Sequence, residues 1–532
     1  MKIRSTMKIL LLSLVVLQHL VSGEGHRILA AFFFPARSHF MMANSIVREL
    51  VKRGHEVTFI TPFSLSHENL GPNYKEIEID QYQSWAIMKE LTNTNTILEM
   101  ADLNKLTFLR MVNIKGIQCT DFVLRQPQIQ ELIHAKEKVG KYDLLLAEQF
   151  YTEGALMLGH LYQIPVITAM TYGGTNYISQ LFGIVSPWSY VPHLYMPYSA
   201  RMSLWERLGN VFMSGTEDLL RRYSYYPGQD AVLQKHFSKL LDRVPTVKEL
   251  ESNISAVLLN GYMPLTSPRP LAYNMIPVGG LHTKPPKALP ENLQEFLDEA
   301  THGAIYFSLG SIVRNTELPP AKLKLLLDVF GSLKQRVLWK FEDESLPNLP
   351  SNVMVKNWLP QIDILAHPNV KVFISHGGIF SLQEAVYSGV PVLGLPIFGD
   401  QYSNIKQAEA AGFALSLDYR ELAAPELRHA LIELLEKPKF RNNIKKASKV
   451  FRDRPMSAMD TAMYWIDYVI EHRGAPHLVS VGMELPWYQF YLLDVIGLGV
   501  TAALLAILAI FIICRKIFNL AKISSSRKIK KT

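Results

Sequence analysis

The residues best suited to chemistry lie in one short stretch, residues 373–401, whose sequence is FISHGGIFSLQEAVYSGVPVLGLPIFGDQ. An apolar run predicts a buried strand, after which His376-Gly377-Gly378 turns the chain into a helix that carries Glu384. Glycine lets the backbone approach a ligand closely, and the unpaired amides and dipole of a helix N-terminus favour phosphate oxygens. The spacing therefore predicts an anion site, to which His376 could donate, although Gly-Gly turns before helices also occur in plain packing.

Polar side chains also follow the next apolar run. Residues 390–396 predict a second strand, and the loop after it ends in Asp400-Gln401. A carboxylate beside a carboxamide supplies acceptors and donors that suit neighbouring sugar hydroxyls. A single strand-helix-strand unit thus offers groups for a ribose, a diphosphate and a sugar.

The amino-terminal half begins with a similar unit. Residues 27–34 predict a buried strand, residues 41–53 a helix and residues 56–60 a second strand. The first turn lacks the G-x-G-x-x-G fingerprint, which argues against a dinucleotide oxidoreductase. It holds His39 instead, and the loops past the carboxyl ends of parallel strands line the ligand crevice of doubly wound folds. A lone loop histidine is more often only solvated, so position alone leaves its role open.

Chain length and charge limit the classes of protein to which this sequence can belong. A chain of 532 residues with 48% apolar and 19% charged side chains holds two or three folded domains and is not disordered. The net charge of +8 suggests nucleic acid, but ten of the 55 basic residues lie in the first 23 and last 18 residues, which contain no acidic residue. The rest of the chain, between these two end segments, contains 45 basic and 47 acidic residues. We therefore expect no nucleic-acid partner.

Both ends of the chain predict membrane targeting. Residues 1–23 have the basic start, apolar core and small residues of a cleaved secretory signal. Residues 495–514 form an uncharged, mainly aliphatic segment long enough to cross a bilayer. The basic segment 515–532 follows, so the tail should be cytosolic and the body lumenal. Four aromatic residues before the span would form the lumenal aromatic belt: Trp487, Tyr488, Phe490 and Tyr491.

Smaller signals concern retention, redox state and modification. Lys528, Lys530 and Lys531 in the tail resemble a dilysine signal that retrieves membrane proteins to the endoplasmic reticulum. Of the two cysteines, Cys119 falls in the predicted lumenal body and Cys514 at the inner edge of the predicted membrane segment, so they should form no intrachain disulfide. Asn253 begins a glycosylation sequon, and its occupancy stays open.

The spacing in the central stretch resembles the signature of the UDP-glycosyltransferases. His-Gly-Gly is followed six residues later by Glu384, seven residues after that by Pro391, and then by Pro396 and Asp400-Gln401. The resemblance extends over almost the whole chain, and from about residue 441 it is to the animal membrane-bound members, insect-like ones included. It implies a glycosyltransferase-B fold, an α/β class with two facing Rossmann-like doubly wound domains and one C-terminal transmembrane helix.

The same resemblance implies domain boundaries. An acceptor-binding α/β domain would span residues 24–284 and a UDP-sugar-binding α/β domain residues 285–440. Residues 441–494 would hold a helix that crosses back to the first domain, together with the juxtamembrane segment. A run of nine prolines and glycines between Pro264 and Pro290 reads as the connector between the two domains.

Site residues carry over from the family position by position. His39 matches the general base, and Glu148 matches the orienting acid, although members often carry Asp at that position. Phe380 departs from a position that is often polar in vertebrate members. The donor-binding set comprises a connector arginine, a serine for the diphosphate, a tryptophan and a glutamine for uracil and ribose, the His-Gly-Gly turn, a ribose acid and a hexose pair: Arg269, Ser311, Trp358, Gln361, His376, Gly377, Gly378, Glu384, Asp400 and Gln401.

The implied reaction is inverting transfer of a glucuronosyl or glucosyl group from a UDP-sugar to the hydroxyl of a small lipophilic acceptor. The product is a β-glycoside of the conjugation or detoxification type, and the partners are UDP-glucose or UDP-glucuronate, the acceptor and the membrane. No metal or other cofactor is expected, because no acidic metal clamp is evident. The alternative is a catalytically silent membrane protein of the endoplasmic reticulum that binds a UDP-sugar or a lipophile. The hexose, the acceptor and the formation of homo-oligomers stay open.

Three further expectations concern packing. Some aromatic and Met side chains between Met170 and Tyr198 should line an apolar acceptor pocket. Arg221 and Arg222 should lie on a solvated helix face. Asp143 should be structural, at the start of a strand that ends in Glu148.

Overall fold

The computed structural model describes residues 25–80 and 96–529. The predicted signal peptide, residues 1–23, therefore lies outside the described residues, as do Lys530 and Lys531 of the retrieval signal. The chain forms two units, a body that ends at Val479 and a tail that begins at Ser480.

The first half of the body is a seven-stranded parallel sheet with strand order β3-β2-β1-β4-β5-β6-β7. Its central strands are buried along their whole length, as expected of parallel strands that helices cover on both faces. The strands are β1 Arg27–Ala31, β2 Glu56–Thr61, β3 Tyr74–Glu78, β4 Leu144–Glu148, β5 Val166–Met170, β6 Ile254–Leu259 and β7 Met275–Pro277. The helices are α2 Arg37–Lys52, α4 Lys105–Leu124, α5 Pro127–Ile133, α6 Met157–Tyr162, α7 Asn176–Leu181, α8 Leu204–Leu220, α9 Tyr226–Phe237 and α10 Val247–Glu251, with a π-helical turn η4 at Arg221–Tyr225.

The second half is a six-stranded parallel sheet with order β10-β9-β8-β11-β12-β13. Its strands are β8 Ala304–Ser308, β9 Arg336–Lys340, β10 Val353–Lys356, β11 Val370–Ser375, β12 Val392–Gly394 and β13 Ala414–Ser416. Its helices are α11 Glu291–Asp298, α12 Pro320–Gly331, α13 Gln361–Leu365, α14 Ile379–Ser388, α15 Gln401–Ala410 and α16 Ala424–Glu436. The expected pair of Rossmann-like doubly wound domains is therefore confirmed. The predicted boundary between residues 284 and 285 falls between β7 and β8 and stays a prediction.

Both sheets reverse their strand order at one place. In the first sheet β1 lies beside β4, and in the second β8 lies beside β11. In open α/β sheets the crevice for ligands lies outside the carboxyl ends of the strands at such a switch point. The chain segments that leave β1, β4, β8 and β11 are therefore placed to form a site.

The first helix begins earlier than the sequence predicts. The predicted helix spans residues 41–53 and leaves His39 in a loop, but α2 begins at Arg37, with a hydrogen bond from Phe40 N–H to Ala36 O of 3.0 Å. The prediction missed this first turn because its residues, Arg-Ser-His, are polar and show no helical apolar period. His39 accordingly lies in the first turn of a helix, directly beyond the end of β1.

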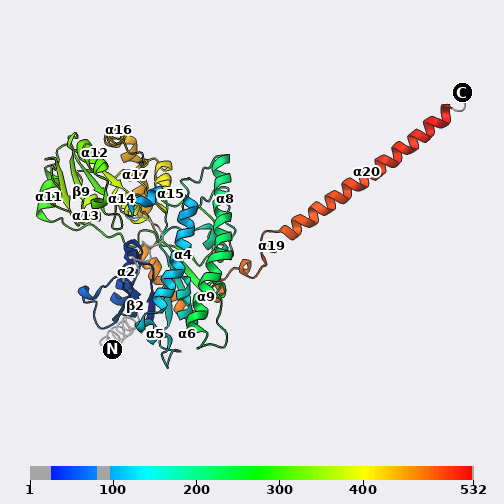
Figure 1. Cartoon of the computed structure of the whole chain (residues 1–532), viewed down its shortest axis with the longest axis horizontal. Coiled ribbons are helices and arrows are strands. Elements are labelled where there is room, and N and C mark those ends of the chain that lie inside the picture. The colour runs from blue at the N-terminus through cyan, green and yellow to red at the C-terminus, as the bar shows by residue number, and fades with distance from the viewer. Residues whose placement is uncertain (1–24, 81–95, 530–532) are drawn as a thin grey trace, which may run out of the picture. The chain divides into compact units, whose positions relative to one another are not determined.

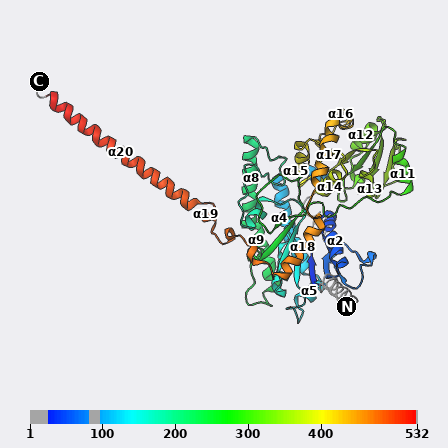
Figure 2. The ribbon, with the colours of Figure 1, turned by 180° about the vertical axis from the view of Figure 1, so that it is seen from behind.

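The two halves are tied together by the segment after α16. Helix α17, Pro438–Arg452, packs on α14 of the second half, and α18, Ala458–Glu471, packs on α2 and β6 of the first (Figures 1 and 2). Between them Arg454 donates a hydrogen bond of 2.6 Å to Gly279 O in the connector and lies 3.6 Å from the centre of the Tyr262 ring. The amphipathic pattern after residue 441 corresponds to α17 and α18, which link the two halves, and the predicted segment of residues 441–494 stays a prediction.

The tail contains the apolar helix. Helix α20 runs over Leu493–Ile529, and its segment Leu493–Lys522 is long and apolar enough to cross a membrane. The span predicted from sequence, residues 495–514, lies inside it, and the helix continues without a break past Arg515. The short helix α19, Trp487–Phe490, precedes it and exposes aromatic side chains.

Candidate functional site

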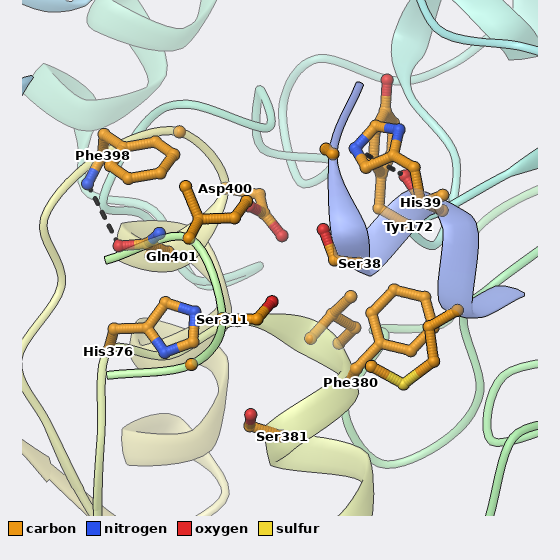
Figure 3. A pocket seen from close by; sticks show the side chains of 18 of the residues that line it. Ser38, His39, Tyr172, Ser311, His376, Phe380, Ser381, Phe398, Asp400 and Gln401 are labelled. Atoms are coloured by element: carbon orange, nitrogen blue, oxygen red, sulfur yellow. Dashed lines mark hydrogen bonds between the residues drawn. The ribbon is translucent and has the colours of Figure 1, made fainter. Parts of the chain in front are cut away.

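One cavity of about 360 Å³ collects side chains from the carboxyl ends of strands in both halves of the body. The first half contributes His39 and Tyr172, and the second contributes Ser311, His376 and Asp400 (Figure 3). A volume of this size suits a small-molecule site. The two switch points therefore open into the same cavity.

His39 and Glu148 are in contact. Nδ1 of His39 meets Oε1 of Glu148, which is the last residue of β4, and the other carboxylate oxygen of Glu148 accepts a hydrogen bond of 3.1 Å from Phe34 N–H. A carboxylate at Nδ1 holds the proton there, so Nε2 carries the basic lone pair. Nε2 lies 3.5 Å from the hydroxyl of Thr171. The glutamate in place of the family's usual aspartate thus reaches the histidine.

Two aromatic rings fix the imidazole of His39. The ring centre of Phe34 lies 5.1 Å away, and the ring of Phe150 meets it edge to face at 4.6 Å. Such contacts restrict rotation of the ring. The side chain is held in one orientation in which Nδ1 faces Glu148.

His376 lies between two glycines. A Cβ atom on Gly310 would come within 2.6 Å of Cε1 of His376, and one on Gly378 within 2.6 Å of Nε2. Gly310 and Gly377 also have φ of +82° and +88°, a conformation that favours glycine. Burial, aided by the nearby charge of Lys340, lowers the pKa of His376 to about 4, so the ring is neutral at pH 7. Its Nδ1 has no hydrogen-bond partner among the residues that the structure describes.

Gln361 positions Glu384. The side-chain amide of Gln361 donates to the Glu384 carboxylate and, over 3.1 Å, to Ser381 Oγ, while the hydroxyl of Tyr306 donates to Gln361 Oε1 over 3.2 Å. Burial raises the pKa of Glu384 to about 7, although the hydrogen bond from Gln361 opposes the shift. Near neutral pH this carboxyl group therefore changes between a donor and an acceptor form.

Trp358 and Ser311 present free surfaces to the cavity. The indole of Trp358 follows β10 and is 73% exposed, which leaves a flat ring face available for stacking. Ser311 follows the Gly310 turn after β8, and its hydroxyl is also exposed. Both line the cavity, and their contacts with the donor stay predictions.

Asp400 and Gln401 differ in their bonding. Oδ2 of Asp400 accepts a hydrogen bond of 2.6 Å from Asn404, and burial raises its pKa. Oε1 of Gln401 accepts from the backbone N–H groups of Ile397 and Phe398, at 2.8 and 3.1 Å (Figure 3). The glutamine oxygen therefore holds the loop after β12, which leaves the other side-chain groups of the pair for a ligand.

Two residues of the predicted donor set, Arg269 and Gly377, are not among the cavity-lining residues. Gly377 belongs to the turn between His376 and Gly378, which both line the cavity, whereas Arg269 lies elsewhere. It is partly buried in the connector, where Nη1 donates a hydrogen bond of 3.0 Å to Gly174 O in the loop after β5. This contact favours a structural role, in which Arg269 stabilises a turn of the connector and does not bind the donor. Sequence spacing cannot distinguish the two roles, because the connector could pack on either half.

Phe380 is buried and meets the ring of His282 at 4.9 Å. The hydrophobic side chain at this often polar position thus packs at the floor of the cavity. Of the predicted aromatic set, Tyr172 and Tyr195 line the cavity. Tyr177 does not, because its hydroxyl donates to the buried carboxylate of Glu251.

Several cavity residues were missed by sequence reasoning. Phe34, Phe150 and Thr171 lie one to three residues past the ends of β1, β4 and β5, and Lys340 is the last residue of β9, where its Nζ lies 3.0 Å from Glu342. Their position after parallel strands is the signal that could have found them. Phe108 comes from α4, and nothing in the sequence pattern points it at the cavity.

The fold and this shared cavity define a class, a glycosyltransferase of the B type. Solved structures support the fold: the chain is similar to the calicheamicin glycosyltransferase CalG4 with a TM-score of 0.54 and 17% identity, covering 85% of this chain and 100% of that one. It is also similar to the glycosyltransferase VinC in complex with dTDP, with a TM-score of 0.55 and 16% identity, covering 84% and 99%.

Sequence comparison gives the family. Residues 32–528 match the family model "UDP-glucoronosyl and UDP-glucosyl transferase". The chain is 36% identical to UDP-glycosyltransferase UGT5 of Dactylopius coccus over 95% of this chain and 96% of that one, and 31% identical to UDP-glucuronosyltransferase 2B13 of Oryctolagus cuniculus over 86% and 87%. The chain belongs to the UDP-glucuronosyl and UDP-glucosyl transferase family, whose members are enzymes that transfer a sugar from a UDP-sugar.

Proposed function

We propose that the protein transfers a glucuronosyl or glucosyl group from its UDP-sugar to the hydroxyl of a small lipophilic acceptor with inversion at the anomeric carbon. The observation that carries this proposal is the His39–Glu148 pair, which shares one cavity with Ser311, His376 and Asp400. Nε2 of His39 takes the hydroxyl proton as the acceptor oxygen attacks the anomeric carbon. The bond from that carbon to the β-phosphate oxygen breaks, and UDP leaves as the β-glycoside forms.

The second half binds the donor in this proposal. Trp358 stacks on uracil, and Gln361 contacts the uracil or ribose. Glu384 accepts hydrogen bonds from the ribose hydroxyls, and Asp400 with Gln401 contacts the hexose. The amides of the His376-Gly377-Gly378 turn, together with His376 and Ser311, stabilise the charge that develops on the diphosphate. We expect no metal requirement, since these hydrogen-bond donors and the helix N-terminus stabilise the negative charge that a cation would otherwise neutralise.

The first half binds the acceptor. Its part of the cavity is mainly apolar, and Phe34, Phe108, Phe150 and Tyr195 supply aromatic surface to it. Apolar walls with a few polar groups select lipophilic molecules that carry a hydroxyl. Together with the apolar helix α20 and the basic tail, this supports a conjugating enzyme of the endoplasmic reticulum membrane with its body in the lumen.

Turnover of a simple phenol by microsomes that contain the protein tests the proposal, with UDP-glucose and UDP-glucuronate offered in parallel. Turnover with one donor identifies the hexose. Intact UDP binding without turnover of any hydroxyl acceptor would instead favour a protein that only binds UDP-sugar.

The affinity for UDP-glucose should depend on pH through Glu384. The ionised carboxylate accepts both ribose hydroxyls, and it is present above a pKa of about 7 and lost as pH falls below it. We therefore expect binding about tenfold weaker at pH 6 than at pH 8. Equilibrium binding of UDP-glucose measures this, because its diphosphate has no ionisation in this range. Glu384→Gln should bind weakly at both pH values, and a variant that kept the full pH dependence would contradict the assignment.

Gly310→Ala should weaken donor binding. The added methyl group would displace the imidazole of His376, and the loss of one hydrogen bond to a charged phosphate corresponds to about 10- to 100-fold in affinity. Gly140→Ala is a matched control, because Gly140 also has a positive φ of +78° but no atom lies within 4 Å of the added Cβ. Isothermal titration with UDP compares the two, and equal losses would show that backbone strain alone causes the effect.

A further inference from the structure

Helix α8 is amphipathic, but its apolar face is exposed and its polar face is turned toward the body. Its buried face is mainly polar, with Met213 as the one apolar residue among its four buried side chains. Nδ2 of Asn210 donates to Val191 O over 3.0 Å, Ser214 accepts from Asn176 over 3.0 Å, and Glu217 accepts from the hydroxyl of Tyr151 over 3.1 Å. Its exposed face is apolar and continues into the π turn that follows: Leu204, Trp205, Leu208, Val211, Phe212, Leu219 and Tyr223. A surface helix of a globular protein normally buries the apolar face.

The apolar side chains form one continuous stripe. Their spacing of three, four and seven residues places them on the same side of a helix about 25 Å long. Trp205 is 78% exposed and Phe212 60% exposed, so the largest rings face outward. In Figures 1 and 2 α8 runs along the outer edge of the body. Exposed apolar patches of this extent mark contact surfaces for a partner or a membrane.

The charges around the stripe favour a membrane. Acidic side chains of α8 turn away from it: Glu206 accepts the backbone N–H of Ser203 over 2.7 Å, Glu217 is buried, and Asp218 lies 3.3 Å from Gln180. Exposed arginines stand at both ends of the stripe, Arg201 before the helix and Arg222 after it. An apolar face with aromatic residues and flanking cations is typical of helices that lie in a membrane interface.

The chain also keeps the body close to a membrane. Only residues 480–492 separate the end of the body from the apolar helix that begins at Leu493. Fully extended, this segment reaches at most about 45 Å. When α20 spans a bilayer, this tether limits how far the body can lie from it, and the stripe is a face suited to contact with that bilayer.

We propose that α8 lies in the membrane interface, with the rings of Trp205 and Phe212 in the boundary between headgroups and acyl chains. The body is then held to the bilayer at two places, by α20 and by α8. The docked helix also supports the cavity wall. The hydroxyl of Tyr151 donates to Glu217 of α8, and Tyr151 is the chain neighbour of Phe150, which lines the cavity. The docking itself does not depend on the reaction proposed above.

Fluorescence quenching by lipid tests the proposal on the full chain. Phe212→Cys is made in a Cys514→Ser background, where Cys119 is buried, and is labelled with an environment-sensitive fluorophore. The labelled protein is placed, one chain per disc, in nanodiscs of phosphatidylcholine brominated near the glycerol end of its acyl chains. Lys324→Cys is the matched control, since Lys324 is exposed on α12, which lies at the opposite side of the body from α8 (Figures 1 and 2).

The label at Phe212→Cys should lose most of its emission, since the apolar face of such a helix lies about 5–10 Å into the boundary region. The label at Lys324→Cys should keep its emission. Leu219→Cys provides a second position on the stripe, and a melting temperature close to that of the unmodified protein shows that each variant folds. Unchanged emission at both stripe positions would overturn the proposal. Crosslinking between Phe212→Cys chains in liposomes, without quenching, would assign the stripe to a second copy instead.

Discussion

His39→Ala is expected to lower turnover about 10²- to 10⁴-fold while UDP affinity stays within a few-fold. The substitution removes the Nε2 lone pair in the acceptor half of the cavity but leaves the groups of the second half in place. Initial rates with saturating UDP-sugar, together with titration of UDP, measure the two effects separately. Residual activity close to that of the unmodified protein would rule out His39 as the base.

Two further variants test whether the loss of turnover comes from the His39–Glu148 pair. Glu148→Gln keeps the size of the side chain but removes the charge that holds the Nδ1 proton and stabilises the imidazolium, so it should also lower kcat while the KM for the donor changes little. His134→Ala changes an exposed histidine outside the cavity and should leave both parameters unaltered. A loss at Glu148→Gln that appeared only in donor affinity would contradict its orienting role.

Arg221→Ala should destabilise the body by about 3–5 kcal/mol, because it removes the arginine that, together with His193, compensates the buried carboxylate of Glu217. Arg221 is buried, with Nε 3.4 Å from Glu217 and its guanidinium 3.5 Å from the centre of the Tyr177 ring. Burial opposes ionisation of Glu217, but His193 and Arg221 outweigh it and lower its pKa to about 2. Burial raises the pKa of the neighbouring Glu153 to about 8, so Glu217 carries the charge that compensates Arg221 at pH 7.

The neighbouring residue supplies the matched control. Arg222 is exposed, and Arg222→Ala should change stability by no more than about 0.5 kcal/mol. Thermal unfolding of both full-length variants at pH 7 provides the comparison. Since the folded pKa of Glu217 lies below its ordinary value of 4.5, the stability from the pair is present above pH 4.5 and lost as pH falls toward 2. Similar melting temperatures for the two variants would contradict the buried charge pair.

The sequence alone predicted the parts of this protein that depend on local pattern. Continuous apolar runs predicted the parallel strands, and the spacing of His376, Gly378, Glu384 and Asp400 predicted a cluster of polar groups that the structure does bring together in one cavity. These signals are reliable because strand burial and glycine turns are set within a few residues of chain. The strand-end rule also placed His39 at the site, although the polar first turn of α2 concealed its helical position.

Only the tertiary structure decided which polar and apolar side chains are buried. The prediction of a solvated face at Arg221 and Arg222 was wrong for Arg221, because the π turn after α8 directs it between Tyr151 and Tyr177 while its neighbour points to solvent. Packing likewise placed Arg269 against the loop after β5, outside the cavity. A residue's burial depends on elements far away in the chain, and helical periodicity identifies two faces of α8 without revealing that the polar one is turned inward.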